Sequence, residues 1–427
     1  MLDRLIAIDN DIRIAIIGIG SIGKGLFYQS HITPGIRCVG IADIRPERAI
    51  ACAEWLGYDY RACGTLDEVH DAVARGRLAI CEDGDLLARC DMTDILLESS
   101  SSVPAGGRFS ETAIRHGKHV ILMNAEADLI FGPYLLQLAR EKGVVYTSCD
   151  GDQPVSIARL VEDVRLWGFE LVMAGNIKGF LDRYANPTSI IPEADKRYLD
   201  YQQCSAYTDG TKLCIEQALV ANAMGLATAV PGMHGPRAAH VREVPALFDL
   251  RGMWERHGPV VDYVLGAEPK GGVFAVGYSD DDYQRRMLAW FPSLLGEGPF
   301  YVFYVPYHLC HVEAMKTVAD VALDRRPLLQ PTHGFRTNVY AYAKRGLRAG
   351  ERLDGIGGYA CYGLIENCGG NGDNPGLPIC LADDVVLTRD IGKDEKILLS
   401  DVRYDSARAD FAMYGKALQA SAKGAVR

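Results

Sequence analysis

The stretch "RIAIIGIGSIGKG", Arg13–Gly25, decides the fold, because it fits two different templates for binding phosphate groups. Gly18-x-Gly20-x-x-Gly23 is the dinucleotide fingerprint, whereas Gly18-x-x-x-x-Gly23-Lys24 is most of a P-loop, which binds nucleoside triphosphates. A P-loop needs Ser or Thr after the lysine, since that hydroxyl ligates Mg²⁺, and here the position is Gly25. The sequence therefore favours the dinucleotide template.

The residues around the fingerprint meet the other requirements of a Rossmann fold. Ile12–Ile17 is a short apolar run, typical of a strand buried on both faces, and a helix is expected from about Ser21. Asp43 closes a second apolar run, and 43 − 23 places it 20 positions beyond Gly23, where an acidic residue bonds the ribose hydroxyls. The alternative is a glycine-rich turn with a purely structural role. The strand before the turn, the helix after it and Asp43 all stand at the spacing of the dinucleotide template, which argues against this alternative.

The fingerprint assigns a role to each glycine. Gly18 permits the tight turn, Gly20 lets the pyrophosphate approach the backbone, and Gly23 lets helix and strand pack closely. Asp43 favours NAD, while Arg45 and Arg48 suit the 2′-phosphate of NADP, so both cofactors stay open. The residues expected at the cofactor are Gly18, Gly20, Ser21, Ile22, Gly23, Asp43, Arg45, Ser99, Ser100, Asn124 and Glu126.

Apolar runs at 94–98, 119–124 and 143–148 alternate with helical segments, which predicts an α/β fold with a doubly wound parallel Rossmann sheet. Beyond Asp150 we expect a helix over 155–167, a strand over 170–174 and an irregular polar segment over 184–209. Runs at 272–278 and 300–307 predict a mostly antiparallel second sheet. Short strands and tight turns from about Thr337 indicate a small β module, followed by a loosely held helix. The expected domains are 1–150 (Rossmann), 151–336 (α+β, catalytic and dimerisation), 337–405 (β module) and 406–427 (tail).

Candidate catalytic residues gather in "YTDGTKLCIEQALVANAMGL", Tyr207–Leu226. With Asp209 as helix N-cap, Asp209, Lys212 and Glu216 are spaced to share one helical stripe. A lysine in the first turn lies at the positive end of the helix dipole, which favours exchange of its proton with a substrate hydroxyl or carbonyl. An ordinary N-cap with a surface Lys–Glu pair is the alternative. Lys178, in "GNIKGF", is expected to hold a substrate phosphate or carboxylate, or to be a simple loop lysine.

Composition excludes several other classes of protein. The net charge of −10 over 427 residues argues against a nucleic-acid or anionic-membrane partner, and no apolar run approaches the roughly 20 residues of a membrane helix. The 12 cysteines contain no C-x-x-C pair, so a cytoplasmic protein is expected.

His308 and His311 lack a third ligand, and no metal site is predicted. The apolar strand at 300–307 needs cover on both faces, which predicts a homodimer.

Several motifs together resemble a known family. The fingerprint, "IADIRPERA", "AIRHGKHVILMNAEAD", "DGTK…E…VANAMGL" and the β-rich C-terminal segment look like homoserine-dehydrogenase-like oxidoreductases with a C-terminal SAF module. That family includes reductoisomerase-like enzymes that convert 1-deoxy-D-xylulose 5-phosphate to 2-C-methyl-D-erythritol 4-phosphate. The resemblance implies that Asp209, Lys212 and Glu216 stand at the substrate, with Lys178 nearby. Homoserine dehydrogenases carry a lysine directly after the asparagine equivalent to Asn124, and here Ala125 and Glu126 follow, so homoserine activity is not expected.

Taken together, the sequence predicts an NAD(P)-dependent oxidoreductase that acts on a small polyhydroxylated substrate, phosphorylated or not, with a reductoisomerase as one version. A non-catalytic NAD(P)-binding sensor or assembly protein is the main alternative. The lysine–carboxylate group speaks against this alternative, because a sensor needs no acid–base group. A kinase or triphosphatase rests on Gly23-Lys24 alone.

Overall fold

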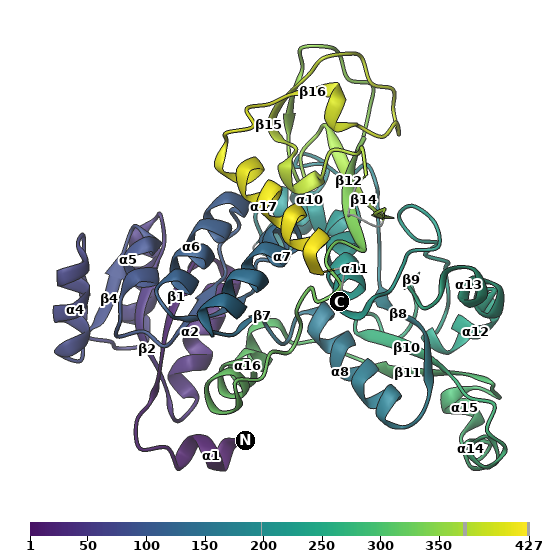
Figure 1. The fold of residues 1–427 in the computed structure, drawn as a ribbon, viewed down its shortest axis with the longest axis horizontal. Helices are drawn as coiled ribbons and strands as arrows, with labels where there is room; N and C mark the ends of the chain where they lie inside the picture. The colour runs from purple at the N-terminus through teal and green to yellow at the C-terminus, as the bar shows by residue number, and fades with distance from the viewer. Residues whose placement is uncertain (198, 370–373, 425–427) are drawn as a thin grey trace. The chain divides into compact units, whose positions relative to one another are not determined.

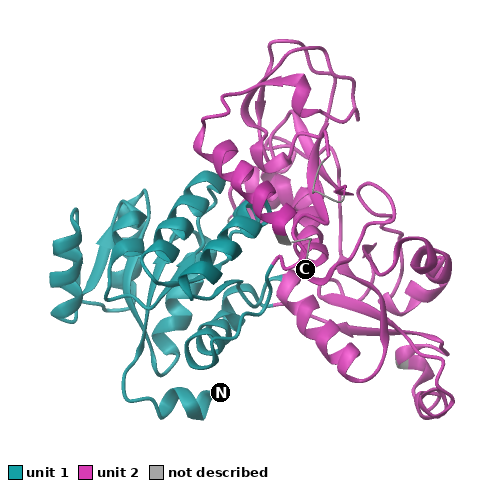
Figure 2. Ribbon diagram, viewed as in Figure 1, with its two compact units in different colours: residues 1–152, 309–330 teal, residues 153–308, 331–427 magenta. Residues whose placement is uncertain are grey.

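The computed structural model describes residues 1–197, 199–369 and 374–424, and it divides into two compact units (Figure 2). Unit 1 comprises Met1–Asp152 and Leu309–Gln330, and unit 2 comprises Gln153–His308 and Pro331–Arg427. Residues 370–373 of the expected β module and residues 425–427 of the expected tail lie outside the described residues.

Unit 1 is built on a parallel sheet with the strand order β3-β4-β2-β1-β5-β6-β7 (Figure 1). The strands are β1 Ile12–Ile17, β2 Ile36–Ala42, β3 Tyr60–Ala62, β4 Leu78–Cys81, β5 Ile95–Glu98, β6 His119–Leu122 and β7 Tyr146–Ser148. Strand order reverses between β1 and β5, so the carboxyl ends of these two strands form the topological switch point where ligands of such sheets bind.

Helices cover both faces of this sheet. They are α1 Leu2–Ile6, α2 Ser21–Ile32, α3 Pro46–Trp55, α4 Leu66–Ala74, α5 Gly84–Arg89, α6 Val103–Arg115, α7 Ala125–Lys142 and α16 Cys310–Asp324. On one face, α2, α3 and α16 pack on Ile14, Ile16 and other alternate strand residues. On the other face, α5 and α6 pack against Ile17 through Gly84 and Phe109. The parallel, doubly wound sheet predicted from the sequence is confirmed.

The chain returns to unit 1 at α16, although the sequence division assigns 309–330 to the second domain. Ala314, Met315 and Val318 of α16 belong to the core of unit 1, and α16 packs along α2. The His311 ring lies so close to Gly25 of α2 that a Cβ there would meet it at 2.3 Å. An apolar helical stripe shows that a helix is buried, but not which sheet it covers.

Unit 2 contains a mixed sheet with the strand order β11-β10-β8-β9. Its strands are β8 Glu170–Lys178, β9 Val260–Leu265, β10 Val273–Tyr278 and β11 Phe300–Val305. β10 pairs antiparallel with β8 and β11, as predicted, whereas β8 and β9 are parallel. The helices are α8 Gln153–Leu166, α9 Ile191–Arg197, α10 Tyr201–Thr208, α11 Thr211–Met224, η1 Val241–Glu243, α12 Val244–Leu247, α13 Leu250–His257, α14 Asp282–Leu288 and α15 Pro292–Leu295. The segment 184–209 thus contains α9 and α10 and is not irregular as expected.

The C-terminal β module pairs β12 with β14, and β15 with β13 and β16. Its elements are β12 Thr337–Ala343, β13 Arg352–Asp354, β14 Cys361–Asn367, η2 Ile379–Leu381, β15 Asp383–Leu387, η3 Leu399–Asp401 and β16 Val402–Arg403. The closing helix α17, Ala409–Gly424, is not loosely held: Phe411, Met413 and Ala417 are buried, and Ser421 Oγ accepts a hydrogen bond from Phe335 N–H at 2.8 Å. The small and polar residues 420–423, "ASAK", gave no sign in the sequence that this helix is packed.

Helix α11 is buried along its whole circumference. It packs against α8 and β9 on one side and against β12 and β14 on the other, so all residues from Thr211 to Asn222 are buried. A helix covered on all sides must be apolar nearly all round, and its charged residues need buried partners. The alternative of a surface Lys–Glu pair on this helix is therefore wrong. No described helix is long and apolar enough to cross a membrane.

Candidate active site

The glycine loop of unit 1 connects β1 to α2 and has the geometry that the fingerprint predicts. Gly18 has φ +89°, which favours glycine, and a Cβ there would meet Ser100 N at 2.6 Å. A Cβ on Gly23 would meet the Gly18 carbonyl oxygen at 1.8 Å, so the helix packs directly on the loop. Gly20 is the N-cap of α2, and among the described residues, its two chain neighbours aside, no heavy atom lies within 4 Å of its Cβ position. The loop is closed beneath Gly18 and Gly23 and open above Gly20, where a pyrophosphate would approach the N–H groups of Ser21 and Ile22.

Ser99 and Ser100 support this loop from the carboxyl end of β5. The Ser99 hydroxyl donates to the carbonyl oxygens of Ile17 (3.0 Å) and Gly18 (2.8 Å). Asp43, at the end of β2, is buried, and its carboxylate accepts from the N–H groups of Ile19 (2.7 Å) and Arg45 (2.9 Å). Asp43 thus holds the glycine loop in place, while Arg45 and Arg48 are exposed beside it.

Glu98 was missed by the sequence interpretation. It ends β5 directly before Ser99, is fully buried, and accepts a hydrogen bond from Ser100 N–H at 2.9 Å. Burial raises the pKa of its carboxyl to about 7, with the Ser100 and Asn124 hydrogen bonds opposing that shift. The signal was present in the sequence, since an acidic residue closing a buried strand at the switch point is unusual.

Asn124 and Glu126 lie at the start of α7, after β6. The Asn124 side chain accepts from Ala127 N–H at 3.0 Å and donates to the Ser102 carbonyl at 3.2 Å, so it caps the helix. Glu126 is half-buried in the first turn. Capping accounts for Asn124, and a contact with the nicotinamide remains a prediction for both residues.

We expect Gly20→Ala to weaken NAD(P) binding at least about 10-fold, or 1.4 kcal/mol, without unfolding the protein. The added methyl has free space in the protein and a permitted φ of −78°, but it occupies the open side of the loop. Isothermal titration with each cofactor, together with Tm, measures both effects. Gly346→Ala, an exposed glycine with equally open surroundings, is the control. Wild-type affinity in Gly20→Ala would mean that the pyrophosphate does not pass this loop.

In unit 2, a β-α-β crossover formed by β8, α11 and β9 positions the candidate catalytic residues. The two strands are parallel, and Ala227, just after α11, forms a parallel bridge with Val260 at the start of β9. The helix therefore runs antiparallel to both strands, and its N-terminus lies at their carboxyl ends. That edge of a parallel pair is where α/β folds place their ligands.

Lys178 and Lys212 lie closer to this edge than the contact between Asn176 and Glu216 does. Asn176 and Lys178 share one face of β8, because strand side chains alternate. Asn176 Nδ2 donates to Glu216 Oε2 at 3.0 Å, and both residues are buried, which fixes the register of helix on strand. Lys212 lies one helical turn before Glu216, and Lys178 two residues beyond Asn176. Both lysines are thus displaced from that contact toward the carboxyl edge; Lys212 is 9% exposed and Lys178 half-buried.

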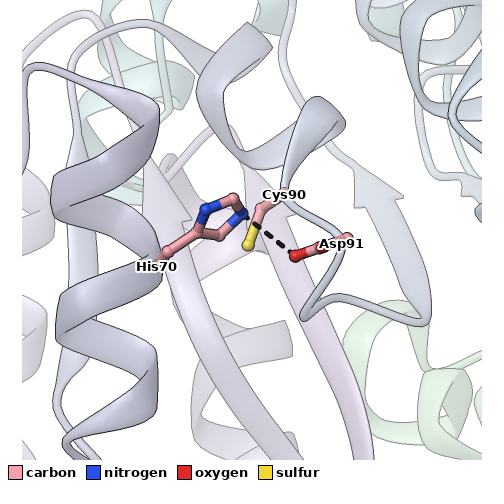
Figure 3. A group of neighbouring side chains, drawn as sticks. All are labelled: His70, Cys90 and Asp91. Carbon is pink, nitrogen blue, oxygen red and sulfur yellow. Dashed lines mark ion pairs between the residues drawn. The ribbon is translucent and has the colours of Figure 1, made fainter.

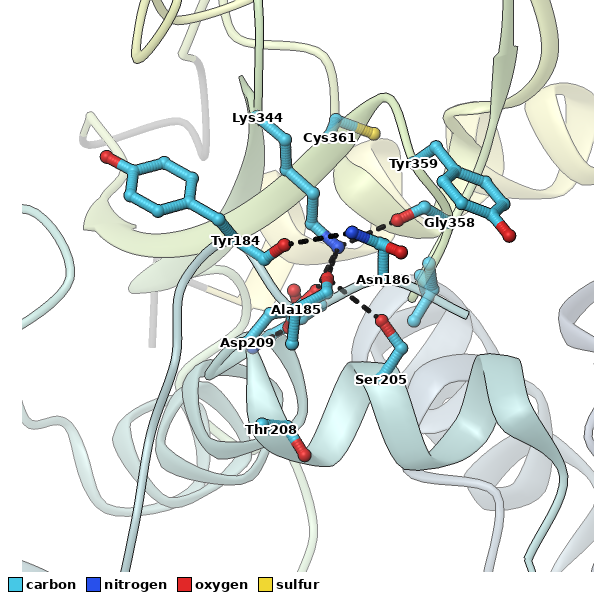
Figure 4. Close-up of polar contacts among 12 residues, drawn as sticks. Tyr184, Ala185, Asn186, Ser205, Thr208, Asp209, Lys344, Gly358, Tyr359 and Cys361 are labelled. Atoms are coloured by element: carbon cyan, nitrogen blue, oxygen red, sulfur yellow. Dashed lines mark hydrogen bonds and ion pairs between the residues drawn. The ribbon is translucent and has the colours of Figure 1, made fainter. Parts of the chain in front are cut away.

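Asp209 is not the N-cap of α11 and does not share its stripe. The helix begins at Thr211 with Gly210 as N-cap in the left-handed conformation, and Asp209 ends α10. One carboxylate oxygen of Asp209 accepts from Thr211 N–H at 2.8 Å, and the other lies 2.9 Å from Lys344 Nζ (Figure 4). Glycine at position 210 permits a positive φ, and the chain therefore turns before the helix begins.

Lys344 was also missed. Its ammonium contacts Asp209 and donates to the carbonyl oxygens of Ala185 (2.5 Å) and Gly358 (2.7 Å), and both charged side chains are buried (Figure 4). Burial raises the pKa of Asp209, and Lys344 opposes that shift. Because the buried ammonium forms an ion pair with Asp209 and donates to two carbonyl oxygens, it fastens the β module to the start of α11. No sequence signal links positions 209 and 344.

His308 and His311 do not stand together in a metal-ligating group within the described residues. The His311 ring packs on Gly25 instead. Strand β11, whose apolar faces were expected to need a second copy as cover, is covered within the chain. Within the chain, Tyr301 and Phe303 of β11 pack on Phe169, while Val302 enters the core on the opposite face, so both faces of this strand are covered.

Two findings define the class of protein. Unit 1 is a dinucleotide-binding fold with an intact glycine loop, and residues 151–314 match the family model described as oxidoreductase DRL, catalytic domain. The chain is an NAD(P)-dependent oxidoreductase. The matched region includes β8, α11 and β9, and therefore Lys178, Lys212 and Glu216, but it excludes Lys344 and spans less than half of the chain.

Solved structures share parts of the fold. A probable dehydrogenase from Thermotoga maritima is 12% identical, with 74% of this chain and 90% of that chain covered and a TM-score of 0.39. The 1-deoxy-D-xylulose 5-phosphate reductoisomerase from Zymomonas mobilis in complex with NADPH is 15% identical, with 49% and 57% covered and a TM-score of 0.34. A scyllo-inositol dehydrogenase from Lactobacillus casei is 16% identical, with 44% and 50% covered and a TM-score of 0.30. No curated protein gave a significant match.

Proposed function

We propose that the protein catalyses NAD(P)-dependent oxidation or reduction of a small polyhydroxylated compound, phosphorylated or not. A reductoisomerase of the 1-deoxy-D-xylulose 5-phosphate type, in which a carbon-skeleton shift precedes reduction, is one version. The glycine loop, Asp43 and Ser99–Ser100 would hold the cofactor, which supplies or accepts the hydride. The alternative is a non-catalytic NAD(P)-binding sensor or assembly protein.

The observation that carries the proposal is the pair of lysines at the carboxyl edge of the β8–α11–β9 crossover. The region matched by the oxidoreductase catalytic domain contains this crossover. Two cations at one strand edge suit a substrate with phosphate, carboxylate or several hydroxyl oxygens. A sensor has no need of a buried lysine one helical turn from a buried glutamate, because burying charge costs free energy.

The residues take separate roles in this proposal. Lys212 exchanges the proton of the reacting hydroxyl, and Glu216, held by Asn176, orients the ammonium from one helical turn away. Lys178 binds the far end of the substrate through a phosphate or carboxylate. Asp209, committed to Lys344 and Thr211, is a positioning residue that fixes the start of α11.

A nucleotide screen followed by a turnover assay tests the function. We expect NAD(H) or NADP(H) to raise the Tm of the full chain, and nicotinamide absorbance to change with at least one polyol or ketose phosphate. Stabilisation by ATP–Mg²⁺ alone would overturn the redox assignment. Stabilisation by NAD(P) without turnover on any such compound would favour the sensor.

We expect Asp43→Ala to shift the ratio of kcat/KM for NADP over NAD upward by about 1–3 kcal/mol, the scale of hydrogen bonds to charged groups. The substitution also removes the Ile19 contact that steadies the loop, but this loss affects both cofactors and cancels in the ratio. Arg45→Ala should move the ratio the other way. An unchanged ratio in both variants would place the ribose elsewhere.

A homodimer in the cytoplasm remains part of the proposal, although the covered strand β11 no longer supplies its reason. Light scattering at micromolar concentration is expected to give twice the chain mass of 46.7 kDa. A monomer across the whole concentration range would contradict this.

A further inference from the structure

A second cluster of reactive side chains lies in unit 1, at the end of the sheet opposite the glycine loop. His70 comes from α4, Cys90 ends α5, and Asp91 follows in the connection that enters β5 at Ile95 (Figure 3). Each side chain offers one ligand atom, and these atoms lie within 4.8 Å of one another. The glycine loop follows the carboxyl end of β1, whereas this cluster precedes the amino end of the neighbouring strand β5, so the two sites are separate.

The His70 ring nitrogen in this cluster has an unusual environment. Nε2 is buried and lies 3.0 Å from Asp91 Oδ1, but the direction of this contact is not that of a hydrogen bond. Nε2 makes no hydrogen bond to any residue that the structure describes. The ring nitrogen therefore has the Asp91 carboxylate as an ion-pair partner without a hydrogen bond, and the two atoms face one another as two ligands of one metal ion would (Figure 3).

The Cys90 sulfur is fully buried beside this nitrogen. Burial raises the pKa of the thiol, while the Met92 N–H, the Thr93 side chain and the Lys118 ammonium act in the opposite direction by favouring the thiolate. A metal ion displaces the thiol proton when it binds, so a protonated apo cysteine is compatible with a metal site. Lys118 opposes a bound cation and would limit the affinity.

We propose that His70, Cys90 and Asp91 bind one zinc ion, with water as the fourth ligand. Thiolate, imidazole and carboxylate are the three protein ligands of zinc, whereas Ca²⁺ and Mg²⁺ take oxygen ligands. Bond lengths of about 2.0–2.3 Å put the ligands of a tetrahedral site roughly 3.3–3.8 Å apart. Asp91, whose side chain is 83% exposed, is free to make the small rotation that closes the site.

The bound ion would tie α4 to the α5–β5 connection at the edge of the Rossmann sheet. Since metal binding adds to folding free energy, the site would stabilise unit 1. It is independent of the proposed reaction, because none of its ligands belongs to the glycine loop or the crossover of unit 2.

Zinc and cobalt titrations of the metal-free full-length protein test the site. We expect the wild type to bind one more Zn²⁺ equivalent than Cys90→Ser or His70→Ala, measured with a competing chromophoric chelator. Losing a residue that only supports a metal ligand weakens metal affinity by up to about 100-fold. Losing a direct ligand should therefore weaken zinc binding at least about 100-fold. Co²⁺ should give a thiolate charge-transfer band in the wild type and none in Cys90→Ser.

Asp91→Asn keeps the test decisive if a core variant fails to fold, since Asp91 is exposed and its loss should weaken binding without lowering Tm. Cys63→Ser and His116→Ala are matched controls in unit 1, outside the cluster, and should bind like the wild type. Equal stoichiometry and affinity in wild type, Asp91→Asn and His70→Ala would overturn the site. The group would then be an ion pair beside a buried thiol.

Discussion

Replacing Lys344 by methionine is expected to lower the Tm of unit 2 by roughly 6–20 °C. The substitution leaves the fully buried Asp209 carboxylate without its cation, and breaking a buried pair in this way costs about 3–5 kcal/mol. For a unit of this size, each kcal/mol shifts Tm by about 2–4 °C. Two carbonyl oxygens, those of Ala185 and Gly358, lose their donor as well. Scanning calorimetry measures the shift.

Two companion variants show whether the charge itself is responsible. Lys270→Met removes an exposed lysine of the same unit and should change Tm little, because exposed pairs contribute about 0–1 kcal/mol. Adding Asp209→Asn to Lys344→Met should restore part of the loss, since the unpaired charge is removed. A Lys344→Met protein that melts like the wild type would show that the pair does not hold the β module.

Replacing Lys212 by alanine is expected to lower turnover at least about 100-fold, the lower end of what a positioned acid or base contributes. Affinity for NAD(P) should be nearly unchanged, because the glycine loop belongs to the other unit. Lys212→Arg should not restore the rate, since arginine cannot release a proton near neutral pH and its planar fork does not fit the place of an ammonium. Steady-state kinetics and cofactor titration measure these effects.

Lys178 supplies the comparison. If it anchors the substrate, Lys178→Ala should mainly raise KM, while Lys178→Arg should retain most of the rate. Recovery of the rate in Lys212→Arg would make Lys212 an anchor and not a proton-transfer group. Wild-type turnover in a folded Lys212→Ala protein would remove α11 from the mechanism and transfer the proton-transfer role to Lys178.

Features that are local in the chain were predictable. The glycine loop, β1, the start of α2 and the end of α11 at Gly225 follow from residue spacing and from the special conformations of glycine. The short strands β3 and β4 were not predicted. The segment containing α9 and α10 hid two helices, because Pro187, Pro192 and its many polar residues are typical of a loop.

The sequence by itself determined the dinucleotide fold, the position of each glycine and the helix that carries Lys212 and Glu216, because backbone sterics and periodicity act over a few residues. Tertiary structure alone decided that α16 joins unit 1, that Asp209 pairs with Lys344, and that His70 meets Cys90 and Asp91. His70 and Cys90 are 20 positions apart in the sequence, and Asp209 and Lys344 are 135 positions apart. No local rule fixes which buried charge or thiol meets which partner over such separations. Only the packing of complete elements, driven by burial of their apolar faces, selects those pairs.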